Sequence, residues 1–323
     1  MSKIYEFFIK FFLIQSLLIS SISYSAEVIP PNAKFISVFF HNDSDTKINF
    51  YNSVDGKKFL LNDNIKSKYF YGRDPNLIFF KNNWYLAHTG VNRFLNGKYS
   101  PFGDFTILKS TDLNNWTSKA VPAYGNNNLR GMKGSAIGGN VDKIVSLWAP
   151  TFFIYHSKLY ITFSVAINKS ISNENSSGQD FFSTALVKVK DLTKLTISLP
   201  KIIINPITDS IIDTQLFDGK DGFIYSVSKS EINGDIIFNK SKDLSSKFHE
   251  FSRIKFKSKY GFMVEAPNVV WNNKYKEWFM YLDRPASNGK YYYLTSINLK
   301  EWSHPKLVNT RSSIRHGNVI NIK

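Results

Sequence analysis

The chain has 323 residues, of which 43% are hydrophobic and 20% charged, so it can bury a large core and does not have the composition of a disordered tail. The absence of cysteine excludes a disulfide scaffold, a thiol nucleophile and a cysteine-ligated zinc or iron–sulfur site. The 41 lysines and arginines against 25 acidic residues give a net charge of +16, which permits an anionic partner such as nucleic acid, a cell surface or an acidic polymer.

The first 25 residues have the layout of a secretory signal peptide. Lys3 and Lys10 precede an apolar run over residues 11–19, which Gln15 and Ser16 interrupt, and small residues lie just before Ala26. The run is too short for a helix that spans a membrane. We therefore expect residues 1–25 to be removed and residues 26–323 to form one domain, secreted or periplasmic, without stable membrane insertion. An uncleaved membrane anchor is the alternative.

Short apolar or alternating runs recur along the rest of the chain, each followed by a polar turn and a second run. Such pairs are typical of β-hairpins. The clearest ones lie at residues 77–87, 152–163, 216–227 and 269–281.

A second element follows these hairpins. It is an expected strand that ends in a polar turn and, in two copies, in a tryptophan: Thr106–Trp116 and Tyr292–Trp302. The pattern indicates an aromatic side chain that folds back to cover the sheet. Weaker copies lie at residues 48–56, 188–192 and 239–244.

Five units of about four strands therefore repeat at roughly 50–75 residues, which is typical of propeller blades. The N-terminal strands, Phe35–Phe40 and residues 47–51, lack an inner strand before them, and the C-terminal run 318–322 lacks a partner after it. Pairing the two ends would complete one blade and remove exposed sheet edges. The sequence thus predicts an all-β fold, a five-bladed β-propeller closed by its N- and C-terminal strands, with a β-sandwich as the alternative.

The densest basic cluster, at residues 253–259, alternates Arg253, Lys255, Lys257 and Lys259. On a strand these side chains would share one face, which favours a solvated outer strand. No helix-turn-helix, zinc-finger or RNA-binding signature accompanies it, so we expect no nucleic-acid partner.

A short motif precedes each expected innermost strand. Because equivalent strand starts surround the axis of a propeller, residues at matched places in the repeats are expected to converge. Aligning the repeats matches Asp74, Ala149, Asp213, Glu265 and His316.

Three carboxylates in one pocket repel one another, which raises the pKa of at least one and leaves a protonated acid beside an ionised base. Cleavage of a glycosidic bond needs that combination, since one acid protonates the leaving oxygen and one base activates water. A single acid at such a place is more often a turn residue that caps a strand. Three at matched places favour a catalytic pocket.

The order of these motifs (Arg-Asp-Pro at 73–75, Trp-Ala-Pro at 148–150, Ile-Asp at 212–213, Glu-Ala-Pro at 265–267 and Arg-His-Gly at 315–317) resembles glycoside hydrolase family 43 over about residues 36–323. The resemblance implies a hydrolase of oligo- or polysaccharides. It implies that Asp74 is the general base, Glu265 the general acid, and Asp213 the third carboxylate, which tunes the pKa of the acid and orients it.

The resemblance also implies substrate-binding residues. His316 matches an axial histidine that lies beside a central calcium or water cluster in some members, so a structural calcium near His316 is the one metal expected; no cofactor is required. Trp148 stands where such enzymes often place an aromatic side chain against the sugar, although a packed core tryptophan is the alternative. Arg73 is the third candidate.

Two departures from the family pattern put the substrate in doubt more than the chemistry: Ala266 stands where the family often has glycine, and Thr214 where it often has proline.

We expect a monomer that hydrolyses α-L-arabinosides or β-D-xylosides by an inverting single displacement. One alternative is a retaining fructoside-type propeller, whose usual Asn-Asp-Pro opening is replaced here by Arg73-Asp74-Pro75. The other is a non-catalytic carbohydrate-binding propeller.

Overall fold

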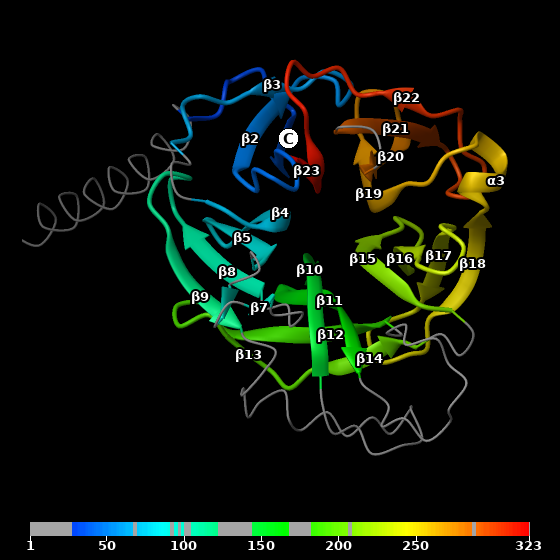
Figure 1. Cartoon of the computed structure of the whole chain (residues 1–323), viewed down its shortest axis with the longest axis horizontal. Helices are drawn as coiled ribbons and strands as arrows, with labels where there is room; N and C mark the ends of the chain where they lie inside the picture. The colour runs from blue at the N-terminus through cyan, green and yellow to red at the C-terminus, as the bar shows by residue number, and fades with distance from the viewer. Residues whose placement is uncertain are drawn as a thin grey trace, which may run out of the picture.

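The computed structural model describes residues 28–66, 70–90, 105–121, 144–167, 182–205, 209–285 and 289–322, and the backbone at 94–95 and 98–99. The described strands form five antiparallel sheets arranged as the blades of a propeller around a central axis (Figure 1). The predicted signal peptide, residues 1–25, lies outside the described residues. Within them, no helix has the length and hydropathy needed to cross a membrane.

The first blade joins the two ends of the chain, and the second and third follow it in sequence. The first contains β23 (Arg315–Asn321), β1 (Phe35–Phe40), β2 (Ile48–Ser53) and β3 (Leu60–Leu61). The second contains β4 (Arg73–Phe80), β5 (Asn83–Thr89), β8 (Phe105–Ser110) and β9 (Thr117–Val121). The third contains β10 (Ile144–Tyr155), β11 (Lys158–Ile167), β12 (Phe182–Asp191), β13 (Thr196–Ile197) and β14 (Lys201–Ile204).

The last two blades complete the ring. The fourth contains β15 (Ile211–Asp218), β16 (Ile224–Ser230), β17 (Ile236–Ser241) and β18 (His249–Ile254). The fifth contains β19 (Glu265–Asn272), β20 (Glu277–Arg284), β21 (Lys290–Ser296) and β22 (Lys306–Leu307). A small hairpin, β6 (Phe94–Leu95) with β7 (Lys98–Tyr99), stands outside the blades, and a short helix, α3 (Phe256–Tyr260), lies between β18 and β19.

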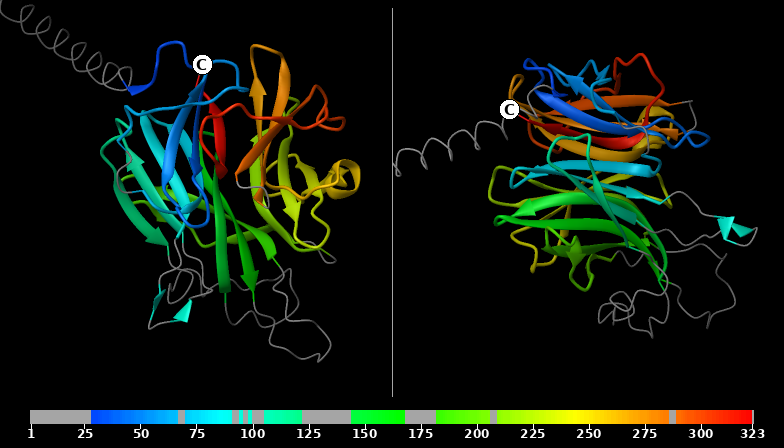
Figure 2. Two further views of the ribbon diagram at one scale, coloured as in Figure 1. Left: turned by 45° about the horizontal axis from the view of Figure 1, so that its top comes forward. Right: turned by 90° about the vertical axis from the view of Figure 1, so that its left-hand side faces the viewer.

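The predicted closure of the ring is confirmed. Strand β23 pairs antiparallel with β1, with Val38 opposite Asn318 and Ile36 opposite Ile320. The views in Figures 1 and 2 show β23 beside the first strands of the chain. Because the last strand lies innermost in the first blade and pairs with β1, the inner edge of β1 is not left exposed.

Aromatic side chains fill the interfaces between blades, which accounts for their abundance. Phe39 and Tyr291 meet edge to face between the first and fifth blades, with ring centroids 4.9 Å apart. Phe105 and Phe163 lie 5.2 Å apart between the second and third blades. Such contacts add about 0.5–1.5 kcal/mol each beyond the burial of apolar area.

Polar side chains tie the innermost strands together around the axis. The side-chain amide of Asn318 accepts from the N–H of Leu77 at 2.7 Å and donates to its carbonyl at 2.9 Å. Gln215 brackets the backbone of Val269 in the same manner. Each bond joins one blade to the next, so the inner strands hold a fixed register at the axis.

The serine-containing turns explain the sequence repeat at residues 110–116. Ser110 Oγ accepts from the backbone N–H of Asp112 and of Leu113, which places buried Leu113 at φ 67°. The indole of Trp116 donates to the Leu113 carbonyl at 2.8 Å and packs against Phe70. The predicted aromatic cover is therefore present.

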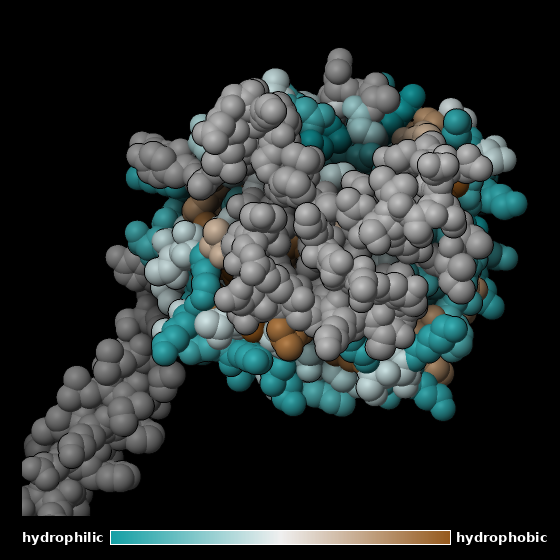
Figure 3. Space-filling model, turned by 60° about the horizontal axis from the view of Figure 1, so that its bottom comes forward, coloured by the Kyte–Doolittle hydropathy of each residue, from teal (hydrophilic) through white to brown (hydrophobic). Residues whose placement is uncertain are grey.

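The expected basic strand face at residues 253–259 is wrong. Strand β18 ends at Ile254, and Lys257 and Lys259 lie in α3. Arg253 is not a free cation, because its guanidinium binds Glu250, Asp209 and Asp235. On the face shown in Figure 3, the described surface is mostly hydrophilic, with small separate apolar areas.

Candidate active site

Four of the five innermost strands carry the same irregularity near their start. The pairing with the second strand shifts register directly after Arg73, Trp148, Ile212 and Glu265. Within each shift one residue that is not glycine adopts a positive φ: 54° at Asp74, 49° at Ala149, 56° at Asp213 and 54° at Ala266. Such backbone is costly and is concentrated at functional sites.

The structure corrects the alignment of one repeat. Ala266, not Glu265, is equivalent to Asp74 and Asp213, so Glu265 lies one residue earlier, at the level of Arg73. Successive side chains of a strand point to opposite sides, which is why Glu265 faces different neighbours from the two aspartates. Pro267 aligns with Pro75 only in this register, so the two prolines were the feature of the sequence that could have given the correct alignment.

Asp74 and His316 form a largely buried pair at the axis. His316 Nδ1 lies 3.0 Å from Asp74 Oδ1, and Thr89 Oγ1 donates to Oδ2 at 2.8 Å. Burial lowers the pKa of His316, but the carboxylates of Asp74 and Asp213 outweigh it and raise that pKa to about 9. Burial opposes ionisation of Asp74, yet the imidazolium holds the Asp74 pKa well below its usual range. Asp74 is thus an ionised carboxylate, as a general base must be.

Asp213 lies in the same hollow, and its pKa is raised where that of Asp74 is lowered. Burial raises its pKa; the attraction of His316 offsets part of this, and the carboxylates of Glu265 and Asp74 raise it further, to about 6. Its Oδ2 accepts from the N–H of Ala266 at 3.0 Å. The site therefore holds one carboxyl group that keeps its proton in mildly acidic solution beside one that does not.

Glu265 lies between two cations. Lys229 Nζ is 2.9 Å from Oε1, and Arg315 Nη2 is 3.5 Å from Oε2. Sequence reasoning did not identify Lys229 as part of the site. The signal for it was a lysine at the end of the otherwise uncharged run 224–230, which is buried throughout.

Arg315 links the site to the closure of the ring. Its Nε donates to Asp283 Oδ2 at 2.6 Å, and its Nη1 donates to Asp43 Oδ2 at 2.7 Å. Asp283 is completely buried on β20. Burial raises the pKa of Asp283 to about 6, even though the guanidinium of Arg315 acts in the opposite direction.

The two remaining candidates lie at the same level as Glu265. Arg73 is half-exposed and pairs with Asp43 at 3.3 Å. The ring of Trp148, which is partly buried, lies against Phe182 with centroids 4.4 Å apart. One contact of Trp148 is thus a packing contact, and its stacking on a sugar stays a prediction.

The space among Asp74, Asp213 and His316 is small, about 10 Å³, enough for about one water molecule. Amide side chains at this level, such as Asn76 and Asn268, already bond to the backbone of the next blade. Among the described residues no cluster of three or more His, Asp and Glu could hold a metal ion. Calcium near His316 stays a prediction, and these side chains do not offer it the six to eight free oxygens it prefers.

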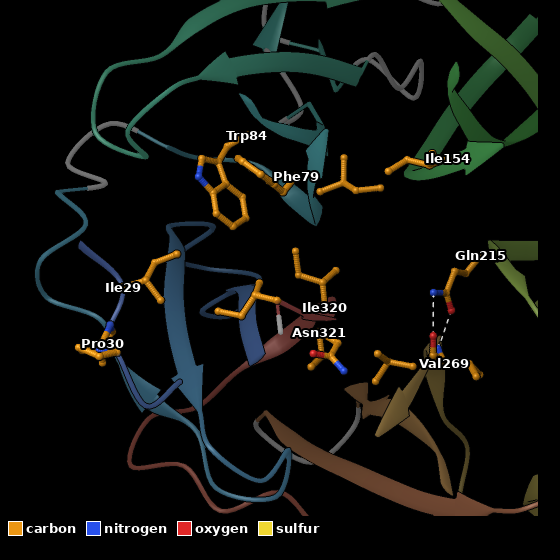
Figure 4. Close-up of a pocket in the computed structure, with 14 residues that line it drawn as sticks. Ile29, Pro30, Phe79, Trp84, Ile154, Gln215, Val269, Ile320 and Asn321 are labelled. Carbon is orange, nitrogen blue, oxygen red and sulfur yellow. Dashed lines mark hydrogen bonds between the residues drawn. The ribbon is translucent and has the colours of Figure 1, made fainter. Parts of the chain in front are cut away.

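A much larger hollow, about 780 Å³, lies at the other ends of the inner strands (Figure 4). It is lined by apolar side chains that include Phe79, Ile154 and Ile320, and its Gln215 is bonded to the backbone of Val269. Among the described residues no acid or base lines it, so the groups that can donate or accept a proton lie at the smaller, polar end of the axis.

His316 should make stability depend on pH. Its pKa of about 9 in the folded protein exceeds the ordinary 6.5, so its contribution is complete below pH 6.5 and is lost as pH rises through 9. We expect the free energy of unfolding to fall by on the order of 3 kcal/mol across that range. Asp74 has a lowered pKa and loses its contribution only in strong acid.

Urea unfolding at stepped pH measures this slope, which His316→Gln should abolish. His249→Gln, at an exposed position on β18, is the matched control and should keep it. An unchanged slope in His316→Gln would show that another group titrates there.

A five-bladed propeller that gathers carboxylates at one end of its axis offers the acid and the base that cleavage of a glycosidic bond needs, which is the arrangement expected of a carbohydrate-active propeller. Residues 33–323 match the sequence family described as "probable glycosyl hydrolase domain", a relative of glycoside hydrolase family 43. The chain therefore belongs to that family and is a glycoside hydrolase, as the sequence predicts. No protein with a curated description matches it.

Several solved structures share the fold. The arabinanase of Bacillus subtilis is 17% identical over 77% of this chain and 86% of its own, with a TM-score of 0.52. A thermostable family-43 glycoside hydrolase is 20% identical over 76% and 78%, with a TM-score of 0.51. An exo-β-1,3-galactanase from Clostridium thermocellum is 12% identical over 86% and 53%, with a TM-score of 0.52. These similarities establish the fold and leave the substrate open.

Proposed function

We propose that the chain hydrolyses α-L-arabinosides or β-D-xylosides with inversion, in a single displacement at the axial site. The observation that carries the proposal is the Asp74–His316 pair, which keeps an ionised carboxylate beside Asp213, a carboxyl group whose pKa is raised to about 6. In this mechanism Glu265 gives its proton to the leaving oxygen. Asp74 takes a proton from a water molecule whose oxygen attacks the anomeric carbon from the opposite face.

The arrangement of charge favours a neutral sugar over an acidic one. The cations described at the site are each paired with an acid: Lys229 with Glu231, Arg315 with Asp283, and Arg73 with Asp43. A uronic acid would have to displace one of these partners. The cations described at the site are therefore neutralised by their partners, and we do not assign the net charge of +16 to substrate binding.

The substrate itself is drawn from related proteins. The arabinanase of Bacillus subtilis and the exo-β-1,3-galactanase share the fold, and they differ in the sugar that their names state. We place arabinosides and xylosides first because the sequence motifs resemble family 43 members of those types. We also propose export by residues 1–25, action as a secreted or periplasmic monomer, and no requirement for a cofactor.

The test uses aryl α-L-arabinofuranosides, β-D-xylosides, β-D-galactosides and fructoside analogues, with the residue 26–323 protein and its Glu265→Gln variant. We expect hydrolysis of an arabinoside or a xyloside. The variant should lose more activity on an oligosaccharide than on aryl glycosides, because a phenolate leaves with little protonation. NMR of the first-formed sugar should show the inverted anomer.

Other outcomes are equally informative. A retained anomer would support the fructoside-type alternative, in which Asp74 is a nucleophile. Sugar binding without hydrolysis of any aryl glycoside or oligosaccharide would support the carbohydrate-binding propeller and would contradict the proposal.

A further inference from the structure

Lys229 is a buried cation shared by two carboxylates. It is 5% exposed on β16, and its Nζ lies 2.6 Å from Glu231 Oε1 and 2.9 Å from Glu265 Oε1. Burial lowers the pKa of Lys229, but Glu265, Glu231 and Asp213 outweigh it and hold that pKa well above its usual range. The side chain is therefore a permanent ammonium group at the proposed acid.

The segment that carries Lys229 and Glu231 is held from behind. The N–H of Glu231 donates to the Ser210 carbonyl at 2.7 Å, and Ser230 Oγ donates to Asp209 Oδ1 at 2.6 Å. Arg253 holds the other oxygen of Asp209 at 3.3 Å. The backbone at Glu231 is thus held by contacts that do not involve Glu265, and the ammonium has a second partner that does not depend on the state of the acid.

Lys229 opposes the protonated form that the proposed mechanism requires of Glu265, and Glu231 reduces this opposition. An ammonium at 2.9 Å favours the carboxylate form of Glu265, whereas a general acid must begin as the carboxylic acid. When Glu265 takes up a proton it loses much of its attraction for Lys229. The bond to Glu231 remains, so Lys229 is not left as an unpaired buried charge, which would be strongly unfavourable.

We infer that Lys229 is a positioning residue for Glu265 and that Glu231 is its second acceptor, the two together setting the pH range over which Glu265 holds its proton. The inference rests on the proposed role of Glu265 as the acid. It predicts opposite effects from two neighbouring substitutions: loss of the ammonium favours protonated Glu265, and loss of the competing carboxylate favours ionised Glu265.

Other charged groups face Glu265 from the surrounding strands, and all are common to the variants. Arg315 approaches from β23 at 3.5 Å, Asp283 lies opposite Glu265 in the β19–β20 register, and Asp213 acts on it from β15. Differences between variants can then be assigned to Lys229 and Glu231.

The first measurement is the pH dependence of kcat on the best aryl glycoside. The alkaline limb, where the acid loses its proton, should move up by about one pH unit in Lys229→Met and move down in Glu231→Gln. Lys242→Met and Glu301→Gln change the net charge equally at exposed sites and should leave the limb in place. Lys229→Arg, which keeps a cation, should restore the limb toward the wild-type position.

The second measurement does not require activity. Protein labelled with ¹³C at glutamate carboxyl groups gives a signal for Glu265, assigned by its loss in Glu265→Gln. The pH at which this signal shifts should rise in Lys229→Met and fall in Glu231→Gln. Opposite shifts in a protein that hydrolyses no glycoside would uphold this inference while the proposed function fails. Shifts in the same direction, or none, overturn it, and Lys229→Arg supplies the comparison if Lys229→Met does not fold.

Discussion

Substitution of Asp74 by asparagine is expected to lower kcat about 10²–10⁴-fold, the usual contribution of a general base. Asparagine keeps the size of the side chain and an acceptor for the Thr89 hydroxyl, which donates to Asp74 Oδ2 in the wild type. It cannot accept a proton from water. Because the defect lies in the chemical step, KM should change little while kcat falls, and the loss should persist for aryl glycosides with good leaving groups.

Asp112→Asn is the matched control for this experiment. Asp112 belongs to the same blade, accepts backbone hydrogen bonds in a turn, and has no role in the proposed mechanism. Its variant should retain full kcat with a modest loss of stability. An Asp74→Asn enzyme that keeps more than about a tenth of the wild-type kcat would remove Asp74 from the proposed role.

The fold was predictable because its signals are local. Apolar runs on both sides of a polar turn predict hairpins such as residues 77–87. The turn at Ser110 is specified by groups within three residues of one another. Counting such units gave five blades, and the unpaired runs at the two ends then required a closing blade. The antiparallel pairing of β1 with β23 followed from that count.

The site was only partly predictable because several of its side chains pair with residues that are far away in the sequence. Repeat alignment brought Asp74, Asp213 and His316 to the axis, where the structure places them. Nothing local indicated that Lys229 pairs with Glu265, 36 residues away, or that Arg315 pairs with Asp43, 272 residues away. Those pairs depend on how blades meet, which follows from packing across the ring.

Replacement of Arg315 by methionine is expected to cost about 3–5 kcal/mol of stability, the usual result of removing one partner from a buried ion pair. Arg315 is 5% exposed and Asp283 is fully buried, so the carboxyl group of Asp283 would lose its guanidinium partner without gaining water. Arg315 also binds Asp43, in the turn between β1 and β2. The loss therefore falls on the joint between the first and fifth blades.

The dependence of this loss on pH separates an electrostatic cause from lost packing. The pKa of Asp283 is raised to about 6 in the folded protein, so the group is neutral in acid and charged in mild base. Unfolding in urea should accordingly show a smaller loss for Arg315→Met at about pH 5 than at about pH 8. Addition of Asp283→Asn to Arg315→Met should recover part of the stability at the higher pH, because it removes the unpaired charge.

An equal loss at both pH values, without recovery in the double variant, would assign the effect to the missing side-chain volume instead. The double variant should still hydrolyse poorly even if it folds well, because Glu265 has lost the cation at its Oε2. Stability that returns without activity would separate the two roles of one side chain: Arg315 fastens the closing strand to the fifth blade, and it holds the proposed acid beside the axis that this closure creates.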